Sequence, residues 1–146
     1  MPFKVSRAST NAQILACHPV MSQLRPHLGK ADFVATIGRM AKEGYRMVFL
    51  TDAEEVRAVL GYRIVETLRT GKMLMVDDLV SADGARSLGY GKALFDWAMR
   101  EARSADCTVM ELDSAVHRAD AHRFYFRQKM HVLGFHFSVA LPPANP

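Results

Sequence analysis

The chain has 146 residues, the size of one folded domain with a substantial hydrophobic core. Hydrophobic residues make up 49% of the sequence and charged residues 23%, which is ordinary for a globular protein and argues against disorder. The net charge of +4 comes without a basic run or a zinc-finger spacing, so no nucleic acid is expected as a partner.

Other residue patterns bear on the cellular location of the protein and on whether it binds a metal or a membrane. Cys17 and Cys107 lie far apart, form no C-x-x-C pair and follow no secretory leader, which favours reduced thiols and a cytoplasmic location. The six histidines show neither H-x-x-x-H nor H-E-x-x-H spacing, so no metal site is expected. No apolar stretch approaches the ~20 residues that cross a bilayer, so no membrane partner is expected.

The first third of the chain predicts one strand and two helices. Weak alternation predicts a strand over residues 3–8, and residues 9–11 can cap a helix over 12–16. Apolar residues then recur at helical spacing between Asp32, a capping residue, and Gly44, where the helix should end.

The middle of the chain predicts three consecutive antiparallel strands. They cover residues 45–51, 56–68 and 73–81, and short turns at 52–55 and 69–72 join them. Strands connected by such short turns pair with their sequence neighbours in a hairpin.

The last third predicts a helix after a glycine turn, a strand over 108–114, a helix over 119–128 and a final strand over 131–141. The order βααβββαβαβ predicts an α/β fold with a mixed, mostly antiparallel sheet flanked by helices. The fourth and fifth strands should be parallel, because a helix crosses between them. No repeat or linker divides residues 1–146, which predicts a single domain.

The most informative motif is the R-x-x-G-x-G run formed by Arg86, Gly89 and Gly91, between the strand at 73–81 and a helix. Backbone N–H groups at a helix N-terminus lack carbonyl partners and carry partial positive charge, so they can bind a phosphate. Glycine allows close approach, and Lys92 adds a cation in the first turn. The helix that follows carries its apolar residues on one face. These are Leu94, Phe95, Ala98, Met99 and Ala102.

This strand, turn and helix, with the later segment containing Ala121, Phe124 and Tyr125, resemble the GCN5-related N-acetyltransferase (GNAT) family. Members of that family bind acetyl coenzyme A and acylate an amine. A dinucleotide-binding fingerprint fits less well, because it needs glycine at the position of Leu94. The resemblance implies a GNAT-like fold in which the parallel strands splay apart.

The resemblance also implies where the cosubstrate acetyl-CoA binds. Its pantetheine arm should pair with the backbone at the end of the fourth strand, and its pyrophosphate should rest on the glycine turn. The implied cofactor-binding residues are Leu79, Val80, Ser81, Arg86, Ser87, Leu88, Gly89, Tyr90, Gly91 and Lys92.

Acetyl transfer to an amine needs a proton for the departing thiolate and a neutral amine. Tyr125 stands where the family places a tyrosine that protonates the coenzyme sulfur. Asp77 and Asp78 are adjacent on a strand, so at most one should face the acceptor, and Asp78 is taken as the candidate catalytic carboxylate. The other candidates for the base are Glu66, Glu111, Asp113 and His117.

The predicted function is therefore direct acetyl transfer to a small-molecule or peptide amine, and a homodimer is compatible with it. One alternative is a non-catalytic acyl-CoA-binding or regulatory module, and another is an interaction domain whose glycine turn is structural. Two departures from the family pattern stand out: Arg118 replaces an asparagine, and Lys129-Met130 replaces Gly-Phe. The second leaves the start of the last strand open.

Overall fold

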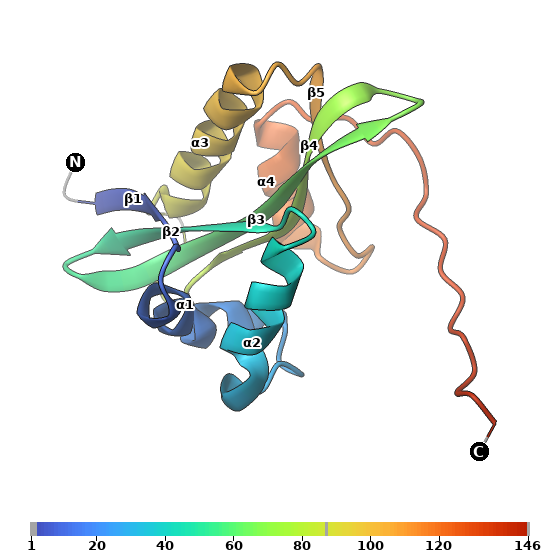
Figure 1. The fold of residues 1–146 in the computed structure, drawn as a ribbon. Helices are drawn as coiled ribbons and strands as arrows, with labels where there is room; N and C mark the ends of the chain where they lie inside the picture. Colours follow the sequence, from blue (N-terminus) through green and yellow to red (C-terminus); the bar gives the residue numbers. More distant parts are fainter. Residues whose placement is uncertain (1–2, 87, 146) are drawn as a thin grey trace. The chain divides into compact units, whose positions relative to one another are not determined.

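The computed structural model describes residues 3–86 and 88–145 (Figure 1). The chain divides into two compact units, Met1–Leu112 and Asp113–Pro146. Across the described part of the chain, no helix combines the length and apolar character that crossing a bilayer requires.

The first unit is built on one five-stranded sheet with the order β1-β2-β3-β4-β5. Its strands are β1 (Phe3–Arg7), β2 (Arg46–Asp52), β3 (Glu55–Thr67), β4 (Gly71–Ser81) and β5 (Val109–Leu112). The first four strands pair antiparallel, whereas β5 pairs parallel to β4. Helix α3 (Tyr90–Ser104) makes the crossover that a parallel pair needs. The predicted mixed sheet with one parallel pair is confirmed.

Helices cover both faces of this sheet. Val59 and Leu60 are adjacent on β3, so their side chains point to opposite faces, yet both are completely buried. Figure 1 shows α1 (Asn11–Leu24) and α2 (Lys30–Ala41) on one face and α3 on the other. The core therefore has two layers, one on each side of the central strands.

Helix α1 is longer than the sequence predicts. It begins with a capping box, in which the Thr10 hydroxyl accepts from the Gln13 backbone and Gln13 Oε1 accepts from the Thr10 backbone. It then runs past the predicted end at residue 16 and through Pro19. Proline removes one helical hydrogen bond, but buried residues on both sides of Pro19, including Cys17 and Val20, hold the helix against the core.

The second unit contains one helix among its described residues, α4 (Ala119–Arg127). Residues 131–145 have no regular secondary structure, so the predicted strand over 131–141 is wrong for the single chain. The physical reason is that an alternating sequence specifies which face of a strand is apolar, but a strand forms only against a partner strand.

Tyr45, just before β2, lies across Gly61 of β3. A Cβ atom on Gly61 would lie 1.8 Å from the Tyr45 hydroxyl oxygen and 2.5 Å from the ring carbon that carries it. The Tyr45 ring is buried, so it has little room to move aside. Only glycine at position 61 lets this tyrosine cross the strand.

We expect Gly61→Ala to lower the free energy of unfolding by about 1–3 kcal/mol, the usual cost of overpacking a core. The matched control is Gly38→Ala on α2, where an added Cβ meets nothing within 4 Å; it should raise stability by about 0.5–1 kcal/mol. Urea unfolding of each variant measures the change in the free energy of unfolding. Wild-type stability of Gly61→Ala would contradict this placement of Tyr45.

Candidate functional site

Strand β4 is paired on both edges over only part of its length. It pairs with β5 over Met73–Val76 and then continues to Ser81 without β5. Its register with β3 shifts by one residue at Gly61, which leaves Asp77 as the extra residue of a β-bulge. Within the described residues of this unit, the β5-facing edge of residues 77–81 carries no strand. The Asp77 carbonyl accepts from Arg25, and a strand edge such as that of residues 78–81 can pair with an extended ligand.

The open edge leads through a loop to the start of α3. The residue that precedes the helix, Gly89, has φ +85°, and no side chain of the described residues caps the helix. The first helical bond at this end runs from Ala93 N to Gly89 O, so the N–H groups of Tyr90, Gly91 and Lys92 have no helical acceptor. A Cβ on Gly89 would meet nothing within 4 Å. The glycine turn therefore presents an uncapped, unobstructed helix N-terminus, which suits an anion.

The cations at this turn are held only by exposed partners. Arg86 Nη2 lies 3.2 Å from Asp83 Oδ1, and Lys92 Nζ lies 2.7 Å from Asp96 Oδ2. Exposed ion pairs contribute little free energy, so both side chains can exchange partners at low cost. Leu88 is also exposed, and Ser87 lies outside the described residues.

Tyr90 takes part in this turn through its backbone alone. Its side chain is buried beneath the helix start, where its hydroxyl donates to the Asp52 carboxylate at the end of β2. Its ring also packs edge-on against Phe3, with the ring centres 6.0 Å apart. The start of α3 is thus anchored to β1 and β2.

Asp78, the candidate catalytic carboxylate, is held by two donors. Arg25 Nε donates to Oδ1 over 2.9 Å and the Tyr45 hydroxyl donates to Oδ2 over 2.8 Å. Burial, and then the nearby Asp78 carboxylate, raise the pKa of Tyr45, so its hydroxyl stays protonated and keeps donating. Arg25 also donates to the Asp77 carbonyl. Because Arg25 follows the last residue of α1, this cluster ties the end of α1 to the bulge of β4.

The other candidate carboxylates of the first unit divide into paired and exposed groups. Asp77 accepts two hydrogen bonds of 2.7 Å from Arg63, and Glu111 accepts two from Arg69, which lower the pKa of Glu111. Glu66 is exposed. Both oxygens of Asp77 and both oxygens of Glu111 accept from a guanidinium, so the geometry favours neither residue as a general base.

Sequence reasoning missed three residues of the Asp78 cluster: Arg25, Tyr45 and Gly61. Arg25 lies 53 positions from Asp78 in the chain, and no local pattern connects the two. Arg63 could have been found, because the short turn between β3 and β4 sets the register and places it diagonally across from Asp77.

The second unit carries Tyr125 and the two remaining candidate bases. Tyr125 lies on α4, half-buried, with its ring edge-on to Phe124. Burial raises the pKa of the Tyr125 phenol, although the Arg118 guanidinium beside it acts in the opposite direction. The phenol is therefore a proton donor at neutral pH. Asp113 and His117 are both exposed.

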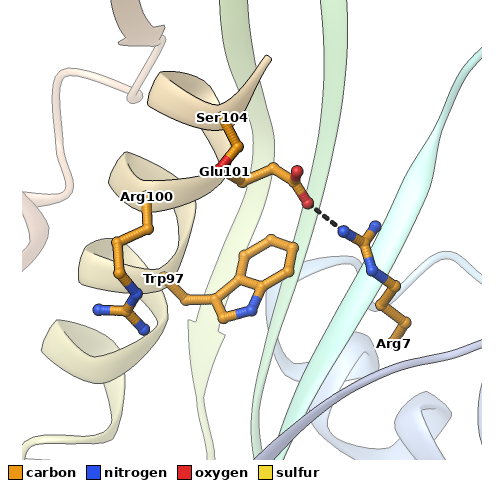
Figure 2. A pocket seen from close by; sticks show the side chains of 5 residues that line it. All are labelled: Arg7, Trp97, Arg100, Glu101 and Ser104. Atoms are coloured by element: carbon orange, nitrogen blue, oxygen red, sulfur yellow. Dashed lines mark hydrogen bonds and ion pairs between the residues drawn. The ribbon is translucent and has the colours of Figure 1, made fainter.

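A separate hollow of about 210 Å³ lies between β1 and α3 (Figure 2). It is lined by Arg7, Trp97, Arg100, Glu101 and Ser104. The Arg7 guanidinium pairs with Glu101 and lies 5.2 Å from the centre of the Trp97 ring. The hollow contains none of the predicted site residues, and its acid and one of its bases neutralise each other. Throughout the described ranges, no group of three His, Cys, Asp or Glu side chains is placed to hold a metal ion.

Comparison with known proteins decides the family. The model of the acetyltransferase (GNAT) family matches residues 18–131. The chain belongs to the GNAT acetyltransferase family. It is 36% identical over 109 residues to the uncharacterized N-acetyltransferase YhdJ of Bacillus subtilis, covering 74% of this chain and 77% of that one. It is also 38% identical to the aminoalkylphosphonate N-acetyltransferase of Salmonella typhimurium, over 45% of this chain and 43% of the relative.

A solved structure agrees at the level of the fold. The aminoglycoside N-acetyltransferase AAC(6')-Iy, in complex with CoA, has a TM-score of 0.83 at 10% identity and covers 95% of this chain and 94% of its own. The predicted family and enzyme class are thus confirmed: the protein is an acyltransferase, an N-acetyltransferase of the GNAT type.

The Asp78 cluster of this acetyltransferase gives a stability prediction. Asp78→Asn replaces one carboxylate oxygen with an amide N–H₂, which cannot accept the hydrogen bond that Arg25 or Tyr45 donates. We therefore expect the free energy of unfolding to fall by about 1–3 kcal/mol. The control, Asp83→Asn, breaks an exposed pair with Arg86 and should change stability by less than about 0.5 kcal/mol. Equal losses in urea unfolding would show that Asp78 is not specifically held.

Proposed function

We propose that this acetyltransferase takes the acetyl group from acetyl-CoA and passes it directly to a small-molecule or peptide amine while both substrates are bound. The observation that carries the proposal is the continuous path from the open edge of β4 to the uncapped start of α3. A strand edge suits an extended amide-containing arm, and a helix N-terminus suits a pyrophosphate.

Two groups of residues would hold the cosubstrate along this path. The backbone of Leu79, Val80 and Ser81 would pair with the pantetheine arm as a neighbouring strand does. The N–H groups from Ser87 to Lys92 would bind the pyrophosphate, with Leu88, Gly89, Tyr90 and Gly91 contributing backbone, and Arg86 and Lys92 contributing charge. The open space at Gly89 supports this assignment, because it leaves the backbone there accessible to an anion.

The chemistry would need little from side chains, because acetyl-CoA supplies a thioester that is already activated for acyl transfer. We assign to the Tyr125 phenol the role of donating a proton to the departing sulfur. The raised pKa of this phenol keeps it protonated. A backbone N–H on the open part of β4 would donate to the acetyl oxygen. Asp78 would hold the acceptor amine, using the lone pairs that Arg25 and Tyr45 leave unused.

Direct transfer is supported by the state of the two cysteines. Burial raises the pKa of Cys17 to about 12, and burial also raises the pKa of Cys107. The thiolate is the nucleophilic form, so neither residue is activated to carry an acyl group. Two unpaired thiols also support a reducing, cytoplasmic location.

The acceptor class can be approached through the relative that acts on aminoalkylphosphonates. We propose these compounds as the first acceptors to test, with release of free CoA thiol as the readout. Release that depends on the added amine would support transfer, whereas release that is the same without amine would indicate hydrolysis alone.

The coenzyme site is tested by Gly89→Asp. We expect CoA to bind the wild-type protein in the micromolar range and the variant roughly 100-fold more weakly, because a carboxylate would face the pyrophosphate at short range. The matched control is Gly71→Asp, at a glycine with a similar φ of +74° and the same open surroundings, at the other end of β4. It should bind CoA normally. Calorimetry showing equal affinity for both variants would remove the glycine turn from the site.

Tyr125→Phe tests the chemistry separately from binding. CoA affinity should stay within a few-fold of wild type while kcat falls roughly 10²-fold or more, the usual contribution of a positioned general acid. Because the pKa of Tyr125 lies above its ordinary value of 10.0, ionisation of this phenol should not lower the wild-type rate below pH 10. A wild-type kcat for the variant would contradict the role, and a parallel loss of stability and binding would indicate a packing residue.

A further inference from the structure

β1 is an edge strand, and half of its backbone groups face away from the sheet. It pairs with β2 along its whole length, and no other described strand pairs with it. Just beyond it, Ala8 N donates to Met47 O of β2. Hydrogen bonding alternates along an antiparallel strand, so the N–H and C=O groups of Phe3, Val5 and Arg7 point to the outer edge. Such an edge can pair with an extended peptide.

The side chains of the same residues face α3. The Phe3 ring packs edge-on against Tyr90 at the start of α3, and the Arg7 guanidinium lies 5.2 Å from the centre of the Trp97 ring. Because side chains alternate along a strand, Val5 shares this face. In an added strand, the residue opposite Arg7 would point to this face too, with its Cβ atom ~5 Å from that of Arg7. Its side chain would reach the hollow between β1 and α3 (Figure 2).

The hollow carries an excess of positive charge. Its acid, Glu101, is mostly buried and accepts from the Arg7 guanidinium and the Tyr62 hydroxyl. Arg7 uses two of its five N–H groups for these partners, and its side chain is 57% exposed. Arg100 also lines the hollow, is exposed and forms no ion pair with a described residue. The group that complements this site is a carboxylate.

The opposite face of β1 carries a further cation. Lys4 is exposed and forms no ion pair with a described residue. Lys4 and Arg7 thus place two positive charges on a strand of five residues, and a short, charged edge discourages chance pairing. Pairing with a second copy would bring the cations of both chains together, whereas an acidic segment meets charges of opposite sign. Charge complementarity therefore selects an acidic partner.

We propose that the outer edge of β1 and the adjoining hollow form a docking site for an acidic, extended segment of a partner protein. The segment adds to the sheet as an antiparallel strand, with Glu or Asp opposite Arg7 and apolar residues opposite Val5 and Phe3. Main-chain hydrogen bonds supply affinity, and the acidic side chain in the hollow supplies specificity. Arginine and tryptophan are enriched where interface residues carry most of the binding energy, and the hollow presents Arg7, Trp97 and Arg100.

A synthetic peptide tests the site. The probe is Thr-Glu-Thr-Val-Thr-Val-Thr with both ends blocked, which places Glu opposite Arg7 and the valines opposite Val5 and Phe3. It contains no amine, so its binding does not report the acceptor site. We expect calorimetry to give a Kd of roughly 10–100 micromolar, and replacing Glu by Gln to weaken binding about 10-fold or more. No saturable binding at about 1 millimolar peptide, or equal affinity for the Gln peptide, would overturn the proposal.

Charge reversal on α3 tests the role of the hollow. Arg100→Glu should weaken binding of the Glu peptide about 10-fold or more, because it replaces the unpaired cation by an acid. The matched control is Arg103→Glu, the same charge change at an exposed position of α3 outside the hollow. It should keep the wild-type affinity within about two-fold. Equal losses for the two variants would reduce the binding to a general attraction between charges and overturn the site.

Methylation of the peptide backbone tests strand addition and leaves the protein unchanged. The outward N–H and C=O groups of Val5 would exchange two hydrogen bonds with the valine opposite. N-methylation of that valine should abolish binding, whereas N-methylation of the threonine before it, whose N–H points away from β1, should not change the affinity. Equal effects of the two methyl groups would overturn the pairing. So would an affinity that falls as the protein concentration rises, because a second copy would then occupy this edge.

Discussion

The site depends on one constraint, the unequal length of the two pairings that β4 makes. A strand in the middle of a sheet normally has both edges bonded, and its backbone is then closed to any ligand. Here β3 pairs along nearly all of β4, while β5 pairs with only the first part of it. The bulge at Asp77 falls where the second pairing stops. The result is a stretch of strand that pairs with β3 on one side and, among the described residues of this unit, with no strand on the other.

The polar cluster around the bulge explains how such an open strand stays in place. Asp78 binds Arg25 and Tyr45, and Asp77 binds Arg63. The side chains of both aspartates are mostly buried, and a buried carboxylate without donors would be strongly destabilising. These ion pairs therefore fix the geometry of the bulge more than they add to the stability of the fold. The bulge has one arrangement in which each carboxylate keeps its partners. The same donors take up part of the hydrogen-bonding capacity of both carboxylates.

The fold and the glycine turn could be predicted from sequence because their signals are local. Alternating residues, short turns and a glycine pair before an apolar helix face each act within about ten positions. The bulge could not be predicted. Asp77 and Asp78 lie between apolar residues, and that apolar pattern indicates a strand whether or not the strand contains a bulge. Arg25 could not be assigned either, since only the tertiary fold brings α1 to β4. The alternation of residues 131–141 predicted a strand that the single chain does not form, because alternation carries no information on a partner strand.

The burial of Tyr90 has a consequence for the entropy of binding. Its side chain fastens the first turn of α3 to β1 and β2 through Phe3 and Asp52, although no side chain in the described part of the chain caps the helix. An uncapped helix end ordinarily frays. A ligand that binds there must order the backbone, which costs conformational entropy. The fastening fixes the first turn of the helix itself. An anion that bound there would lose less free energy to ordering this backbone.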